Sequence, residues 1–114
     1  MKNFSFSILI VAIVLTILLF SNNASTQELS HKQMINHCNN ISELARTIMT
    51  KRQNGVTMRE MMNVEFNEKV RELVHGLIIA AYDVAKFNSS EYKNKYINRF
   101  ENEVYSMCIK EMKK

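Results

Sequence analysis

The sequence predicts an all-α fold, a small bundle of three main helices plus one short helix. Three observations lead to this prediction. Apolar residues recur at alternating spacings of four and three through most of the chain, which is typical of helices with one buried face. The chain has no proline, and its only glycines are Gly55 and Gly76, so helix breakers are few. No run alternates apolar and polar residues with the period of two that a half-buried strand requires.

The first predicted helix carries such an apolar stripe and ends near Gln53. Asn54 or Gly55 would then adopt the left-handed conformation that ends many helices. The stripe consists of Met34, Cys38, Ile41, Ala45 and Ile48, widened by Leu44 and Met49.

A short helix is predicted from Met58 to about Val64. Thr57 is followed three residues later by Glu60, which is the pattern of a capping box. In a capping box each of the two side chains hydrogen-bonds the backbone of the other residue at the start of a helix.

The methionines of this short helix allow two interpretations. Met58, Met61 and Met62 share one face, because positions three and four apart are neighbours on a helix. They either fill an irregular gap at the end of the bundle or form an adaptable surface for a partner. We predict a mixed outcome, in which Met61 packs inward. The predicted partner surface consists of Arg52, Met58, Arg59 and Met62.

The third helix is predicted to begin after Asn67, a favourable N-cap residue, and to reach about Lys86. The fourth, capped by Asn88 or Ser89, runs into a lysine-rich end that suits a helix C-terminus. Apolar residues follow one face of each helix, and these faces should build the core. They are Val70, Leu73, Val74, Leu77, Ile78, Ala81, Val84 and Ala85 on the third helix, and Ile97, Phe100, Val104, Met107 and Cys108 on the fourth.

Residues 1–24 differ from the rest of the chain and have the order of a secretory signal peptide. Lys2 provides a positive start, residues 4–20 carry no charge, and a short polar segment with small residues follows. We predict cleavage after Ala24, which leaves residues 25–114 as a single helical domain exported to the periplasm or secreted. The alternative is an uncleaved membrane anchor, for which the apolar core is short.

The two cysteines, Cys38 and Cys108, predict one disulfide in an exported chain. They lie on the apolar faces of the first and last helices, so their pairing requires these faces to meet. The disulfide and the hydrophobic pattern therefore predict the same arrangement. Closing so long a loop would restrict the unfolded chain and stabilise the fold by about 4 kcal/mol.

Charge and motifs exclude several classes of function. The formal net charge is +4 at pH 7, and acidic and basic residues are interspersed, so we expect no nucleic-acid partner. His31, His37 and His75 show no zinc-ligand spacing, and we predict neither a metal nor a cofactor. A domain of this size offers little room for the cleft and raised pKa that catalytic carboxylates need, so we predict no enzyme.

Three segments carry a resemblance to a known group: "ISELARTIMTKRQNGVTMREMM", "LIIAAYDVAKFNSSEY" and "INRFENEVYSMCIK". The chain resembles small exported helical proteins of unknown function from proteobacteria and their phages. The resemblance runs from Cys38 to Lys110 and implies export and a disulfide, but no catalytic residue. It rests on the two cysteines, on Arg52, Gln53 and Gly55, on the Ala81-Tyr82 pair, and on Phe100 and Asn102.

These observations predict a small periplasmic protein that binds or inhibits a protein partner. Two alternatives stay open. One is a periplasmic chaperone of the acid-stress type. The other is a membrane-active or lysis-related protein, which requires that the N-terminal segment is retained.

Overall fold

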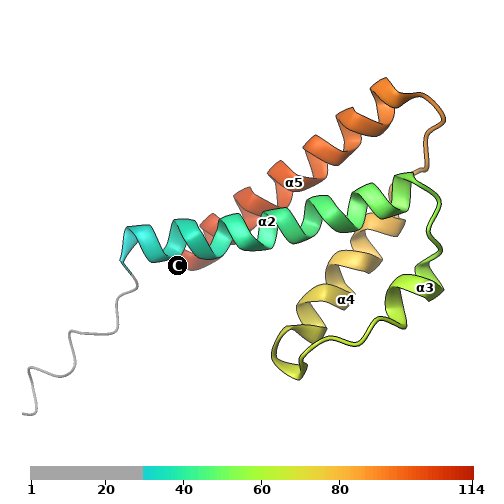
Figure 1. Ribbon diagram of the computed structural model, residues 1–114. Helices are drawn as coiled ribbons and strands as arrows, with labels where there is room; N and C mark the ends of the chain where they lie inside the picture. Colours follow the sequence, from blue (N-terminus) through green and yellow to red (C-terminus); the bar gives the residue numbers. More distant parts are fainter. Residues whose placement is uncertain (1–29) are drawn as a thin grey trace, which may run out of the picture. The chain divides into compact units, whose positions relative to one another are not determined.

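The computed structural model describes residues 30–114, and the predicted signal segment, residues 1–24, lies outside them. The described chain forms four helices without a strand (Figure 1). This confirms the prediction of an all-α fold with three main helices and one short helix. The helices are α2 (His31–Gln53), α3 (Met58–Met62), α4 (Glu68–Tyr82) and α5 (Ser90–Met112).

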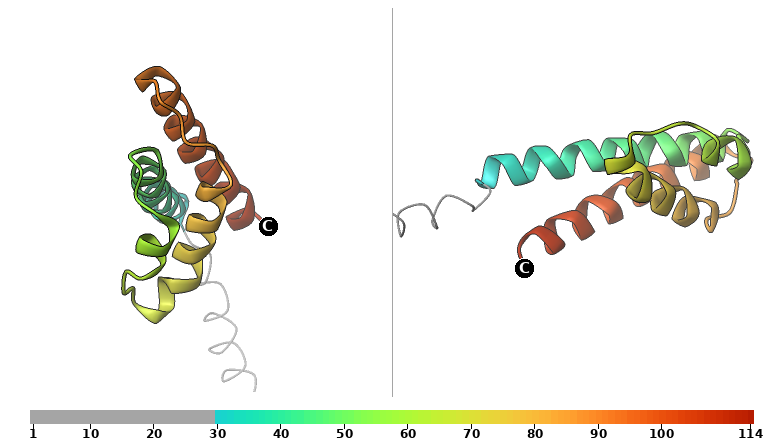
Figure 2. Two further views of the ribbon diagram at one scale, coloured as in Figure 1. Left: turned by 90° about the vertical axis from the view of Figure 1, so that its right-hand side faces the viewer. Right: turned by 90° about the horizontal axis from the view of Figure 1, so that it is seen from below.

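The antiparallel pair of α2 and α5 forms the largest interface between helices (Figures 1 and 2). At one end the predicted disulfide joins Cys38 to Cys108, with an S–S distance of 2.11 Å and a Cα–Cα distance of 5.6 Å. Between the ends, Arg46 on α2 donates to the Glu101 carboxylate on α5 at 2.6 Å. The first and last helices are therefore joined, as the sequence predicts.

Helix α4 packs on α2, and α3 packs on α4, whereas α4 and α5 scarcely approach each other. Figure 2 shows α4 and α5 diverging on the same side of α2. The result is an open three-helix arrangement in which α2 contacts both of its long neighbours.

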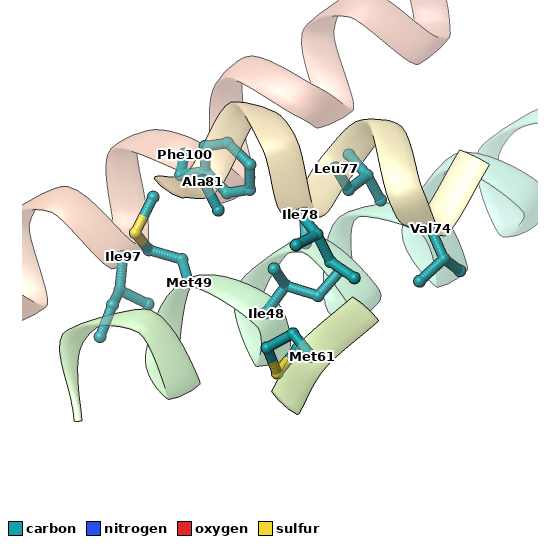
Figure 3. Packing of buried hydrophobic residues seen from close by; sticks show 10 residues of the cluster. Ile48, Met49, Met61, Val74, Leu77, Ile78, Ala81, Ile97 and Phe100 are labelled. Carbon is teal, nitrogen blue, oxygen red and sulfur yellow. The ribbon is translucent and has the colours of Figure 1, made fainter. Parts of the chain in front are cut away.

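One apolar core lies between α2 and the two long helices that pack on it, α4 and α5, and Met61 of α3 joins it. Figure 3 shows side chains from all four helices meeting there. Ile48, Met49 and Ile78 are among its fully enclosed side chains. The other members are Ala45, Met61, Val74, Leu77, Ala81, Ile97 and Phe100.

The third predicted helix ends earlier than expected, at Tyr82 rather than near Lys86. The reason is a side chain from α2. The buried Gln53 amide donates to the carbonyl of Ala85 at 2.8 Å and accepts from the backbone N–H of Phe87 at 2.9 Å. These backbone groups bind Gln53 instead of continuing the hydrogen-bond pattern of α4. The short helix likewise ends at Met62 rather than at Val64.

Three large side chains of the predicted apolar stripes are exposed, contrary to expectation, and so is the small Ala85. Val70 is 42% exposed, Leu73 40% and Met107 64%. They belong to α4 and α5, which diverge from each other, so no helix covers these positions.

Candidate functional site

The residues of α3 occupy three different environments. Met61 is 5% exposed and belongs to the core, which confirms the prediction that it packs inward. Met62 is half-buried against the same core. Met58 is 37% exposed, and Arg59 is exposed beside it. Of the predicted partner surface, α3 therefore presents mainly Met58 and Arg59 to solvent.

The start of α3 is held by the predicted capping box. The Glu60 carboxylate accepts hydrogen bonds from the backbone N–H and the hydroxyl of Thr57, at 2.9 and 3.0 Å. The Glu60 backbone N–H in turn donates to the Thr57 hydroxyl at 3.2 Å. Because the hydrogen bonds to Thr57 favour the charged carboxylate, they lower the pKa of Glu60. The capping box thus fixes the direction in which α3 leaves the preceding turn.

Arg52, the remaining member of the predicted surface, connects the end of α2 to the end of α4. Its Nε donates to the carbonyl of Val84 at 3.2 Å, and its guanidinium lies over the ring of Tyr82, 4.9 Å from the centroid. The Tyr82 hydroxyl donates to the carbonyl of Val56. Burial raises the pKa of Tyr82. Arg52 is therefore engaged within the fold and only partly available to a partner.

The turn after α2 needs its glycine. Gly55 has a φ of +91°, which side chains rarely adopt. Together with Arg52, Gln53 and Tyr82 it forms what we call the polar joint, which ties the end of α2 to the segment between α4 and α5. All four residues are among those on which the resemblance rests, and their contacts here are structural.

The remaining predicted residues take structural or exposed positions. Cys38 is fully buried and Cys108 half-buried, both in the disulfide. His31 and His37 are exposed and His75 is half-buried. Within residues 30–114, no group of three His, Cys, Asp or Glu side chains could hold a metal ion. In the same range, none of the helices has the length and apolar character needed to cross a membrane.

A feature that the sequence reasoning missed is an apolar groove between α4 and α5, here called the α4–α5 groove. It has a volume of about 510 Å³. From α4 it is lined by Leu73, Gly76, Leu77 and Ala80, and from α5 by Phe100, Val104 and Met107. Glu72, Val84 and Glu103 complete the lining. The groove exists because both helices pack on α2 rather than on each other.

The groove continues toward the segment that connects α4 to α5. A second hollow of about 370 Å³ shares Val84, Phe100 and Glu103 with it. The rings of Phe87 and Tyr96, which line this second hollow, stack with centroids 4.4 Å apart. The two hollows therefore lie next to each other along α5, with three lining residues in common.

Two features of the sequence of α4 could have revealed the groove. Val70 and Leu73 make its apolar stripe wider than contact with one neighbouring helix requires. Gly76 lies inside the helix, where glycine is unfavourable unless a packing or functional reason favours it. An added Cβ at Gly76 would meet no atom within 4 Å, so this glycine borders open space instead of a packed neighbour.

No protein-family model, curated protein or solved structure matches this chain. The resemblance to small exported helical proteins therefore stays a prediction.

Proposed function

We propose that this chain is an exported, non-catalytic helical protein that binds a protein partner, with the α4–α5 groove as the contact site. The observation that carries the proposal is the groove itself, which leaves Leu73 and Met107 exposed, at 40% and 64%. Clustered exposure of large apolar side chains in a hollow is typical of interaction sites rather than of free surface.

The shape of the groove favours a protein over a small molecule. Small-molecule sites enclose most of the ligand surface, whereas this groove is open to solvent and leaves Leu73 and Met107 exposed. Grooves of this kind accept the apolar face of a helix from another chain.

The frame around the groove is preorganised. The disulfide ties one end of α5 to α2, and the polar joint ties the other end through Gln53. A site whose walls are already held loses less conformational freedom on binding, which improves affinity. The disulfide also supports export, because such bonds persist in oxidising compartments.

Met58 and Arg59 form a second candidate contact on α3, separate from the groove. Both are exposed, and an apolar side chain beside a cation is a common composition at interfaces. The proposal therefore predicts contact at Met107 and allows a further contact at Met58.

Site-specific photo-crosslinking in the native host tests the proposal. A photoreactive amino acid replaces Met107 in the groove, Met58 on α3, or Glu43 on the exposed face of α2 as the control. We expect one discrete crosslinked protein from position 107 and none from position 43. Equal crosslinking from all three positions would contradict the proposal. Crosslinks from position 107 to many unrelated proteins would favour the chaperone alternative.

A further inference from the structure

The length of the α4–α5 groove matches a short stretch of helix. Together with the adjoining hollow, it is lined on the α5 side by residues from Tyr96 to Met107. At 1.5 Å per residue this corresponds to about 16 Å, or about three helical turns. An amphipathic helix presents apolar residues on one face at spacings of three and four, so three turns provide about four anchoring side chains.

The charged residues that line the groove and the adjoining hollow are mainly acidic, although the protein as a whole is basic. The chain carries a formal net charge of +4, yet the charged residues that line the two hollows are Glu72, Asp83, Glu103 and Arg99. Arg99 donates to Glu103 at 2.9 Å. The carboxylates of Glu72 and Asp83 remain. Within residues 30–114, neither Glu72 nor Asp83 forms a salt bridge.

The two unpaired carboxylates lie on the same side of the groove, along α4 and at its C-cap. They are eleven positions apart, about 16 Å by the same helical rise. Glu72 lines the α4–α5 groove and Asp83 lines the adjoining hollow, so each of the two hollows has one carboxylate without a salt bridge. An occupant that places a cation opposite each carboxylate would gain electrostatic complementarity without burying an unpaired charge.

From this geometry we infer that the α4–α5 groove binds an amphipathic helix of a partner protein that carries Lys or Arg at both ends of a three-turn apolar face. The inference rests on the proposed function and adds the chemistry of the partner. The apolar face of that helix lies against Leu73, Ala80 and Met107. Its basic residues face Glu72 and Asp83.

Gly76 offers a way to close the groove without disturbing the fold. Because an added side chain at this position would project into open space, Gly76→Leu fills the groove and also favours the helix. Ile79→Phe is the matched control, since Ile79 is 50% exposed on the same helix and does not line the groove.

The test is a selection from a displayed library of three-turn helical peptides against the exported protein, purified from cells that express the full chain. The library varies the anchor positions among apolar residues and the end positions among Lys, Arg, Gln and Glu. We expect the enriched peptides to carry Lys or Arg at both ends. Gly76→Leu should weaken their binding by at least about tenfold, and Ile79→Phe should leave it unchanged.

Charge reversal tests the electrostatic part. Glu72→Lys combined with Asp83→Lys should weaken binding of the basic peptides several-fold and reduce its dependence on salt, and peptides with Glu at both ends should then bind. Enrichment of neutral or acidic peptides by the wild-type protein, or no enrichment, would overturn the inference. So would full binding by Gly76→Leu.

Two further outcomes would contradict this inference, which rests on the proposed function, and the second of them leaves that function intact. If sedimentation shows a dimer of the wild-type protein that Gly76→Leu dissociates, the occupant is a second copy and the inference is wrong. If a crosslinked partner at position 107 contacts the groove through a segment that is not a basic helix, the proposed function stands and the inference fails.

Discussion

The α2–α5 pair and the α3–α4 arm are held in different ways. The pair has the larger interface, a covalent bond at one end and an ion pair between its helices. The arm has apolar contact with α2, a five-residue helix and the polar joint. This difference explains why a groove is present. Helix α5 is fixed to α2 and does not need α4, so the space between α4 and α5 can stay open at no cost to the main interface.

The largest expected effect is on the α2–α5 pair, through its disulfide. The bond closes a loop with a sequence separation of 70. Cys38→Ala combined with Cys108→Ala should lower the free energy of unfolding by about 4 kcal/mol, because the unfolded chain regains the freedom that the loop removes. Urea unfolding measures the change. Cys38→Ala alone should lower the free energy of unfolding as much as the double substitution does. Identical urea unfolding curves for the oxidised and the reduced wild type would contradict the prediction.

The next effect concerns the arm, where α3 contributes one core side chain. Met61→Ala should lower the free energy of unfolding by about 3 kcal/mol, since Met61 is 5% exposed and its loss leaves a cavity. Met58→Ala is the control from the same helix, and we expect less than about 1 kcal/mol because that side chain is 37% exposed. The loss in the free energy of unfolding for Met62→Ala should lie between these two values. Equal losses for Met58 and Met61 would mean that α3 is buried on both sides.

Gln53 connects the two regions, so its replacement tests both. Gln53→Leu puts an apolar side chain of similar size in the site but leaves the Ala85 carbonyl and the Phe87 N–H without their partner. We expect a loss of about 2 kcal/mol. Hydrogen exchange of the Phe87 amide should accelerate far more than exchange within α2. Replacing the exposed neighbour in Asn54→Ala should change neither quantity.

The smallest effect is expected at Tyr82, and it depends on pH. Tyr82→Phe removes the hydrogen bond to Val56 and should cost about 1 kcal/mol. Because burial raises the pKa of Tyr82, the folded state holds this proton more tightly than the unfolded state does. Its contribution is complete below the unfolded pKa of about 10 and is lost as pH rises through the folded pKa.

Urea unfolding at about pH 8 and pH 11 measures this effect. The wild type should lose more stability between the two values than Tyr82→Phe does, since the lysines titrate in both proteins. The same loss in both proteins would show that Tyr82 titrates alike in the folded and unfolded chain.

Local rules made much of the fold predictable. The capping box at Thr57 and Glu60 and the caps at Asn67 and Ser89 involve neighbours in sequence, and the structure has all three. The disulfide was predictable because the chain has only two cysteines, both on apolar faces. These features required no knowledge of how the helices are arranged.

What the sequence did not reveal depends on contacts between distant residues. Helix α4 ends early because Gln53, 32 positions before Ala85, binds the following backbone. The sequence predicts Arg52 on a partner surface, but in the structure its side chain binds the Val84 carbonyl and lies over the Tyr82 ring. The groove was missed because an apolar stripe does not show whether a neighbouring helix covers it.

The disulfide also determines how the protein responds to a protease. The connections around Asn63 and Asn88 are exposed, and both lie between Cys38 and Cys108 in the chain. A single cut in either connection leaves two fragments that are still covalently joined. The nicked molecule keeps its mass, apart from an added water, until a reductant separates the pieces. One such cut is therefore not sufficient to release half of the protein.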